Sequence, residues 1–247
     1  MISIITTTMN SSGTIRDTLR SVQEQTHPEV EHIIIDGVSN DDTLEIVNSF
    51  PHVKIIRTEP DTGIYDAMNK GIRLASGDII GFLNSDDFYP DSGILSKVAE
   101  AFTQYDTDSC YGDLQYVDKF DTSVIVRNWK SGSFNRNKFI TGWMPPHPTF
   151  FVKKQVYEKY GLFDLGLRSS ADYELMLRLL YKHQISTHYI SETLVKMRTG
   201  GQSNVTIGNR LRANGEDKLA WIINGLEPQF YTTWLKPIRK IMQYKFF

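Results

Sequence analysis

The chain changes from apolar to acidic within one short segment, Ile79-Ile80-Gly81-Phe82-Leu83-Asn84-Ser85-Asp86-Asp87. Its apolar first half predicts a buried strand over residues 79–83. Two adjacent carboxylates follow, and carboxylate oxygens are ligands that Mg²⁺ and Mn²⁺ prefer. The pair also fits a solvated turn in which an aspartate caps the helix after Pro90. These residues alone leave both interpretations open.

Upstream of this segment, strands and helices are expected to alternate. Short β-branched runs predict strands over residues 2–6, 32–35 and 53–56. Apolar residues at helical spacing predict helices around residues 15–22, from residue 44 onward, and over residues 67–75. This alternation indicates a doubly wound α/β domain with a mostly parallel central sheet flanked by helices. In such sheets ligands bind beyond the carboxyl ends of the strands, where Asp36 and the Asp86-Asp87 pair are expected.

The second half of the chain is less regular. Strands are expected near residues 109–116, 124–129, 149–152 and 185–190, with a helix near 171–182. At 247 residues with a net charge of −2, the chain has room for a large core and no electrostatic case for a nucleic-acid partner. A single cysteine, Cys110, excludes a disulfide framework and fits a reducing, cytoplasmic compartment. No signal peptide or membrane-spanning run is expected.

Two further acidic positions are candidates for chemistry. Asp36 ends its strand, where it can accept hydrogen bonds from a ribose or a base N–H, or simply form a turn. No glycine-rich phosphate loop follows either early strand, which favours phosphate binding through a metal. Asp172 lies in the first turn of a predicted helix, where it can cap the helix or act as a general base. On that helix Glu174 and Arg178 can pair at the i, i+4 spacing.

Six segments match, in order and spacing, the motifs of one known family. They are Asn10 after the first strand, residues 35–43, 63–71, 77–78 with 82–87, 171–175, and 200–203. In these segments the chain resembles the family-2 glycosyltransferases of GT-A fold, a Rossmann-like nucleotide-diphospho-sugar transferase fold. The bacterial exopolysaccharide branch, including colanic-acid-type enzymes, is the most similar. The resemblance covers about residues 1–205.

The resemblance implies an inverting, metal-dependent enzyme that moves one sugar from a nucleotide diphosphate sugar, typically UDP-linked, to a hydroxyl acceptor. A glycan or a lipid-linked intermediate of polysaccharide biosynthesis would be that acceptor. The Gln-x-x-Arg-Trp signature of processive synthases is absent, which favours transfer of a single sugar. One carboxylate base without a second nucleophile is typical of inversion by single displacement.

The resemblance also implies roles for individual residues. Donor nucleotide binding would fall to Thr7, Asp36, Asp66, Asn69 and Asp86. Asp87, together with Asp86, would bind the Mn²⁺ or Mg²⁺ that bridges the two phosphates, and Asp172 would deprotonate the acceptor hydroxyl. His147, in a proline-rich segment, either lines the acceptor site or is simply held in its loop. The chain departs from the family pattern at three positions. Many relatives have an aromatic residue where this chain has Met9, an aspartate in place of Asn84, and a glutamate in place of Ala171.

Residues 206–247 are expected to form a C-terminal helical tail after a catalytic domain of residues 1–205. The apolar side chains of one helical face would be Trp234, Leu235, Ile238, Ile241 and Met242, and the basic ones are Lys236, Arg239, Lys240 and Lys245. This pattern suits a peripheral helix on the anionic inner face of a membrane. Packing onto the domain or onto a second subunit is the alternative, and the oligomeric state stays open.

Two other functions use similar residues. A nucleotidyltransferase also carries paired carboxylates on an α/β sheet, but it usually has a glycine-rich, basic loop near its N-terminus, and this chain has none. A catalytically silent nucleotide-sugar-binding module would keep Asp36 and Asp87 without needing Asp172. Slow hydrolysis of a nucleotide sugar would distinguish an enzyme from a silent module.

Overall fold

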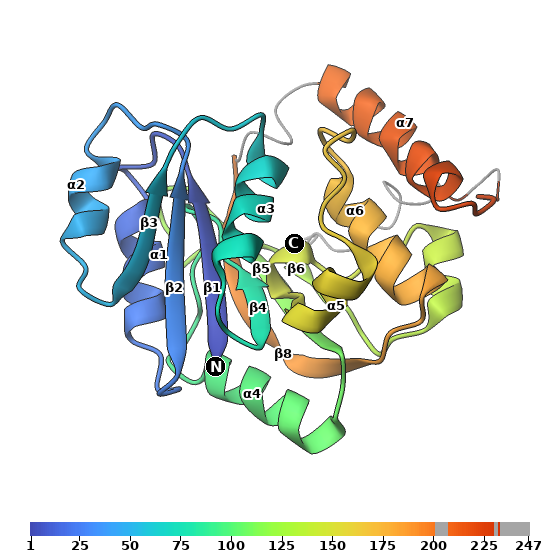
Figure 1. Ribbon diagram of the computed structural model, residues 1–247, viewed down its shortest axis with the longest axis horizontal. Coiled ribbons are helices and arrows are strands. Elements are labelled where there is room, and N and C mark those ends of the chain that lie inside the picture. Colours follow the sequence, from blue (N-terminus) through green and yellow to red (C-terminus); the bar gives the residue numbers. More distant parts are fainter. Residues whose placement is uncertain (201–206, 230–231, 233–247) are drawn as a thin grey trace.

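A central eight-stranded sheet with helices on both faces organises the protein (Figure 1). The computed structural model describes residues 1–200, 207–229 and 232. In the first half, β1 (Ile2–Thr8), β2 (Val30–Asp36), β3 (Val53–Thr58) and β4 (Ile79–Phe82) lie in the order β3-β2-β1-β4 and pair in parallel. The connecting helices are α1 (Ile15–Gln23), α2 (Thr43–Asn48) and α3 (Ile64–Leu74). The predicted α/β alternation is confirmed.

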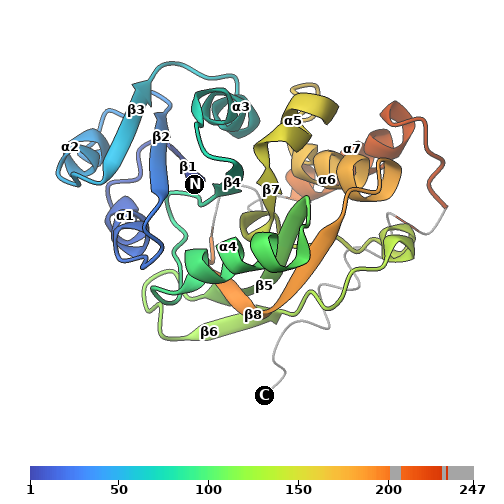
Figure 2. The ribbon, with the colours of Figure 1, turned by 60° about the horizontal axis from the view of Figure 1, so that its bottom comes forward.

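Successive residues of these strands face opposite layers, because side chains alternate along a strand. Ile33 and Ile35 pack with α3 on one face, whereas Ile34 packs with α1 and α2 on the other. Figure 2 shows the two helix layers on either side of β1–β3. Burial on both faces explains why β1 and β2 have continuous β-branched runs, whereas the edge strand β3 is largely exposed.

The close packing of α3 on β1 depends on a glycine. A Cβ atom on Gly71 would overlap Cγ2 of Ile5. The helix therefore lies nearer to the sheet than any larger side chain at this position would allow, and it carries Tyr65, Asp66 and Asn69 with it.

Beyond β4 the strands no longer pair only in parallel. The remaining strands are β5 (Ser109–Val117), β6 (Ile125–Trp129), β7 (Phe151–Lys153) and β8 (Thr187–Arg198). β7 pairs antiparallel with β4 and β5, β6 pairs antiparallel with β5, and β8 pairs parallel with β5. Helices α4 (Ile94–Tyr105) and α5 (Lys154–Tyr160) complete this half, with short 3₁₀ turns at Arg136–Thr141 and His147–Thr149.

Strand β8 is longer than the sequence indicated. It was expected over residues 185–190 but runs over residues 187–198. Its partners explain the difference, because β8 pairs along the length of β5 and Lys196 forms an additional bridge with Phe88. This long strand brings its C-terminal end to the segment that follows β4.

The helix expected over residues 171–182 changes its hydrogen bonding midway. α6 (Ala171–Met176) continues as a π-helical segment, η3 (Leu177–Lys182). The next helix, α7 (Ile207–Ile223), begins just after the expected domain boundary and packs on α6 through the buried Ala220 and Trp221. The indole N–H of Trp221 donates to the Tyr173 hydroxyl at 2.9 Å. The predicted tail helix, Trp234–Phe247, lies outside the described residues.

Candidate active site

Polar side chains gather where three neighbouring strands end. Thr7 and Thr8 end β1, Asp36 ends β2, and Asn84–Asp87 follow β4. β1 lies between β2 and β4, and Thr8 is the pairing partner of Asp36. The parallel sheet therefore brings these residues to one edge, as the sequence predicted.

The loops after β1 and β2 are tied together and strained. Asn10 donates its backbone N–H to Ser39 Oγ at 2.8 Å, and its side-chain oxygen accepts from the Asn40 N–H at 2.9 Å. Asn10 has φ of 52° and Val38 has φ of 65°. Left-handed backbone is rare for a β-branched residue such as Val38, and such strain persists where the surrounding structure enforces it, frequently at functional sites.

Asp36 forms a turn as well as ending a strand. Its Oδ2 accepts from the Ser39 N–H at 3.0 Å, and its Oδ1 accepts from the Ser39 hydroxyl at 2.5 Å. The side chain is fully buried, while Met9 and Val38 beside it are 61% and 50% exposed. The turn interpretation therefore describes the contacts of Asp36, and two apolar side chains lie exposed at the same strand ends.

Asp87 is a buried carboxylate whose hydrogen bonding is incomplete. It is fully buried, its Oδ2 accepts from Asn84 Nδ2 at 3.0 Å, and within the described chain its Oδ1 has no hydrogen-bond partner. Burial and then the charge of Asp86 raise the pKa of Asp87, and burial raises the pKa of Asp86. Neither aspartate caps a helix, because α4 begins at Ile94 with Gly93 as its N-cap. The capping interpretation is wrong.

This arrangement suits a divalent cation. A buried carboxylate oxygen without a hydrogen-bond partner, next to a second carboxylate, is a group that a bound cation would stabilise. The described residues contain no cluster of three or more His, Cys, Asp or Glu side chains that could hold a metal alone. Two carboxylates therefore fit Mg²⁺ or Mn²⁺ in a site where substrate phosphates and water complete the oxygen ligands. Asn84 donates to Asp87, which an aspartate at that position could not do as a carboxylate.

Arg198, at the end of β8, contacts the candidate site, and the sequence analysis missed it. Its Nη1 donates to the Asp86 carbonyl at 2.7 Å and its Nη2 to Asp17 Oδ2 at 2.5 Å. The residue is only 6% exposed, and its charge lowers the pKa of both Asp86 and Asp87, against the effect of burial. Its position just before the Gly200 motif was the available signal, but the strand that delivers it was predicted too short.

A second group of polar side chains contains Asp172. Its Oδ1 accepts from the Tyr65 hydroxyl at 3.1 Å. The N-cap of α6 is Ser170, and no side chain caps that position, so Asp172 is not the cap. His147 is buried, and within the described residues its Nε2 has no partner. Burial lowers the pKa of His147, while the charge of Asp172 opposes that effect, so the imidazole is neutral at neutral pH.

Phe82 connects the two groups. Its ring centroid lies 5.3 Å from that of His147 and 5.5 Å from that of Phe163. Phe82 ends β4, two residues before Asn84, so the acidic segment and the residues around Asp172 both lie near the carboxyl end of this strand. The candidate metal site follows β4 directly, and the candidate base is linked to the same strand through Tyr65, Phe163 and Phe82.

Two residues that were predicted to bind the nucleotide form hydrogen bonds with the protein backbone instead. Asp66 accepts from the Thr62 N–H at 3.0 Å, and this bond lowers the pKa of Asp66. Asn69 is 2% exposed and bonds to both backbone groups of Phe163. Direct nucleotide contacts by these two residues, and by the 8% exposed Thr7, stay predictions.

Comparison with known proteins decides the family. The model of glycosyl transferase family 2 matches residues 3–161. The chain belongs to this family. The family 2 glycosyltransferase is 30% identical over 217 residues to a PGL/p-HBAD biosynthesis glycosyltransferase of Mycobacterium bovis, covering 84% of this chain and 80% of that protein. It is 29% identical over 203 residues to an uncharacterized glycosyltransferase of Haemophilus influenzae, covering 78% of this chain and 67% of the other.

Solved structures support the GT-A fold. The S. aureus protein TarS (residues 1–349, in complex with UDP-GlcNAc) superposes with a TM-score of 0.70 at 17% identity, covering 90% of this chain. The glycosyltransferase spans 65% of that TarS chain. The mannosyltransferase PcManGT from Pyrobaculum calidifontis, in complex with GDP-Man and Mn²⁺, gives a TM-score of 0.67 at 14% identity, covering 96% of this chain and 72% of that one. At these identities the likeness shows the fold alone.

Proposed function

We propose that this glycosyltransferase moves a single sugar from a nucleotide diphosphate sugar to a hydroxyl acceptor, with inversion at the anomeric carbon. The observation that carries the proposal is that two sets of carboxylates lie around β4. One is the Asp86-Asp87 pair that follows the strand, in which Asp87 is fully buried, and the other is Asp172, which bonds to Tyr65 in the group of residues that packs on Phe82. The nucleotide sugars named with TarS and PcManGT support the same donor class. UDP is the first nucleotide to test.

The donor binds at the ends of β1, β2 and β4 in this proposal. Asp87, with Asp86, would hold Mn²⁺ or Mg²⁺, a role for which the unpartnered Oδ1 of Asp87 is suited, and such a cation would supply positive charge to neutralise the departing diphosphate. Arg198 adds a fixed positive charge beside the same residues. The exposed Met9 and Val38 offer an apolar surface to the nucleobase. Thr7, Asp36, Asp66 and Asn69 shape this part of the site.

Asp172 acts as the general base. The acceptor oxygen forms a bond to the anomeric carbon as the bond from that carbon to the diphosphate oxygen breaks. The acceptor proton passes to Asp172, and the nucleoside diphosphate leaves. His147, neutral and with an unpartnered Nε2, forms a hydrogen bond with a sugar hydroxyl. In this proposal one carboxylate, Asp172, acts on the acceptor as a base, and such a mechanism is a direct displacement with inversion.

We further propose an acceptor in glycan or lipid-linked intermediates of polysaccharide biosynthesis, at the inner face of a membrane. Within the described residues, no helix has the length and apolar character required to cross a bilayer. Leu219, Ile222 and Ile223 of α7 are 42%, 55% and 45% exposed, an apolar stripe at helical spacing. This stripe and the basic C-terminal segment in the sequence suit peripheral attachment at a lipid surface, where such an acceptor would be found.

A donor screen with an Asp172→Asn variant tests the proposal. UDP- and GDP-sugars are incubated with Mn²⁺, with and without candidate acceptors, and release of the nucleoside diphosphate is measured. The variant keeps the shape of the side chain but cannot accept the proton. Calorimetry should show unchanged donor affinity, while transfer falls by about 100-fold or more.

The control is Asp106→Asn, which changes an aspartate whose side chain is 98% exposed and should leave both quantities unchanged. Bound donor that stays intact in the wild-type protein under all conditions would favour the silent nucleotide-sugar-binding module. Equal losses of binding and transfer in Asp172→Asn would assign Asp172 a structural role.

A further inference from the structure

The hydrogen bond between Tyr65 and Asp172 joins the two halves of the fold. The Tyr65 hydroxyl, on α3, donates to Asp172 Oδ1, on α6, at 3.1 Å across 107 residues of sequence. Burial and the charge of Asp172 raise the pKa of Tyr65 well above its usual range, so the phenol remains a donor. Within the described chain Asp172 Oδ2 accepts no hydrogen bond. Tyr65 therefore occupies one of the two carboxylate oxygens of Asp172.

The ring of Tyr65 is held in place by Phe163. The two rings stack at a centroid distance of 5.4 Å with an interplanar angle of 26°. Phe163 also meets His147 edge-on, at 5.5 Å and 88°. One buried aromatic residue thus supports both Tyr65, which bonds to Asp172, and His147, the other polar group of that site.

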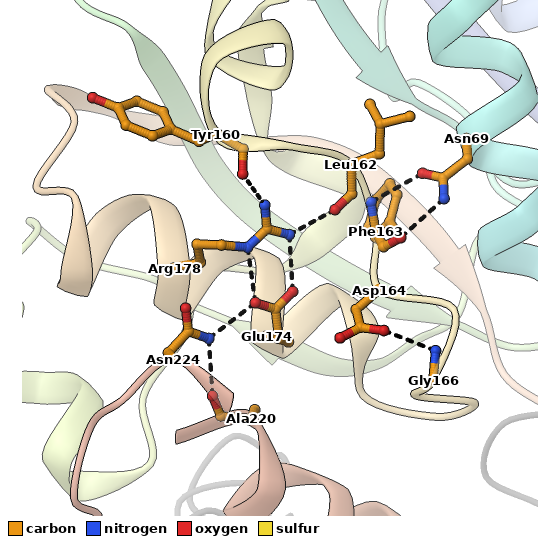
Figure 3. A network of polar contacts seen from close by, with 10 residues as sticks. All are labelled: Asn69, Tyr160, Leu162, Phe163, Asp164, Gly166, Glu174, Arg178, Ala220 and Asn224. Carbon is orange, nitrogen blue, oxygen red and sulfur yellow. Dashed lines mark hydrogen bonds and ion pairs between the residues drawn. The ribbon is translucent and has the colours of Figure 1, made fainter. Parts of the chain in front are cut away.

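The backbone around Phe163 is clamped from two sides (Figure 3). Asn69 donates to the Phe163 carbonyl and accepts from the Phe163 N–H, each at 2.9 Å. Arg178 donates to the carbonyls of Tyr160 and Leu162 while its guanidinium forms a two-bond pair with Glu174, at 2.8 and 2.9 Å. Both clamping residues are largely buried, so the loop that carries Phe163 has little freedom to move.

Side chains of α7 and of the residue after it form hydrogen bonds with the start and the middle of α6. Glu216 Oε2 accepts from the backbone N–H groups of Ser169 and Ser170, at 2.7 and 3.0 Å, directly before Asp172. Asn224 donates to Glu174 Oε1 at 2.9 Å (Figure 3). The backbone just before Asp172 is therefore held by α7, and the Asp172 carboxylate bonds to Tyr65.

We infer that Tyr65 is a positioning residue for the general base: its hydroxyl fixes one oxygen of Asp172 so that the other faces the acceptor hydroxyl. The inference rests on the proposed role of Asp172. A carboxylate without this bond can rotate about its side-chain torsions, and each misplaced orientation removes the base from the reacting proton. The stacking on Phe163 gives Tyr65 the rigidity that such positioning requires.

Tyr65→Phe tests the inference, because it keeps the ring stacked on Phe163 and removes only the hydroxyl. The matched control is Tyr189→Phe, which removes another Tyr hydroxyl bonded to a carboxylate, Asp113 Oδ1, at 2.8 Å. Tyr65→Phe should lower kcat for transfer by on the order of 10- to 100-fold, with the donor KM unchanged. Tyr189→Phe should lose comparable thermal stability while keeping kcat.

A double variant makes the result specific to the base. In Asp172→Asn the hydroxyl has no carboxylate to orient, so adding Tyr65→Phe should lower kcat no further. An unchanged kcat in Tyr65→Phe, a rise in donor KM, or additive losses in the double variant would overturn the inference. If Asp172→Asn itself retains full transfer, the proposed base fails, and that outcome is distinct from a failure of Tyr65 alone.

Discussion

The burial of the Asp87 carboxylate lowers the stability of the fold, and its proposed function explains why the residue is there. It places a carboxylate in a fully buried position beside Asp86, with one oxygen that no described group satisfies. Burying a charge without a full set of partners costs free energy of folding, and such costs persist where function needs the group. A bound cation would remove much of this cost, so stability and ligand binding should respond to Asp87 in opposite directions.

Asp87→Asn tests that expectation. Without donor or metal, the variant should unfold at a temperature equal to or above that of the wild-type protein, because the buried charge is gone. Addition of Mn²⁺ with a nucleoside diphosphate should raise the unfolding temperature of the wild-type protein but not of the variant. Thermal-shift measurements with Asp106→Asn as control check both effects. Undiminished Mn²⁺-dependent stabilisation of Asp87→Asn would remove this residue from the metal site.

Not every site residue was accessible to sequence analysis. Asp36, Asp86 and Asp87 were found because each lies at or just after the end of a strand that local pattern predicts. Arg198 and Tyr65 were missed as site residues, because their contacts with Asp86 and Asp172 join residues 112 and 107 positions apart. Only the folded sheet brings such residues together.

At the scale of elements, the same substitution at two helical glycines should change the free energy of unfolding in opposite directions. Gly71→Ala places a methyl group against Ile5 beneath α3, which should lower the free energy of unfolding by about 1–3 kcal/mol. Gly215→Ala in α7 meets nothing within 4 Å and should raise it by about 0.5–1 kcal/mol through helix propensity. Urea unfolding of the two variants checks this pair. A stable Gly71→Ala protein would show that α3 can shift from β1.

The sheet also contains a pH-sensitive pair. His32 on β2 contacts His52 through its Nδ1 at 3.0 Å and Thr6 through its Nε2 at 3.0 Å. Burial, with a smaller contribution from the charge of His52, lowers the pKa of His32 to about 3. Burial and the nearby Lys54 lower the pKa of His52. Both imidazoles are therefore neutral in the folded protein at neutral pH.

Acid should weaken the fold through this pair. A depressed histidine pKa means that the unfolded chain binds more protons below its own pKa of about 6.5, so stability is present above that pH and is lost below it. One such histidine costs about 1.4 kcal/mol between pH 7.5 and pH 5.5. Urea unfolding at the two pH values checks the slope, and His52→Gln should reduce it. A slope that His32→Gln and His52→Gln both leave unchanged would contradict the assignment.

At the scale of the whole molecule, α7 belongs to the packed structure around Asp172. Its Trp221 is buried against α6, and its Glu216 and Asn224 bond to residues of α6 or just before it. The opposite side of α7 carries the exposed stripe of Leu219, Ile222 and Ile223. One helix thus supports the candidate base on one side and presents an apolar surface on the other.

Truncation before Trp234 tests the membrane proposal. All proposed site residues lie upstream, so the shortened protein should keep its nucleotide affinity. It should no longer sediment with anionic vesicles, because about 1 kcal/mol of attraction is lost for each basic residue removed near the surface. For the full-length chain, high salt or purely zwitterionic vesicles should reduce sedimentation. Truncation that unfolds the protein, or a full-length chain that ignores anionic vesicles at low salt, would assign the segment to the core or to a subunit interface.

The sequence by itself determined the features that depend on neighbouring residues. The period of apolar side chains predicted β1–β4 with their connecting helices, and the position of Asp36 and Asp87 at strand ends followed from those strands. The i, i+4 pairing of Glu174 with Arg178 was likewise predicted and is confirmed. Each of these features arises from hydrogen bonds and packing within a few residues, or from the general rule that parallel strands end at one edge.

Only the tertiary structure decided the rest. The length of β8 depends on pairing with β5 and Phe88, and the orphaned oxygen of Asp87 depends on which groups fold around it. The bond from Tyr65 to Asp172 depends on α3 and α6 meeting across the molecule. Such contacts join residues that are distant in the chain, and their geometry follows from how the whole core packs. A local pattern contains no information about that packing.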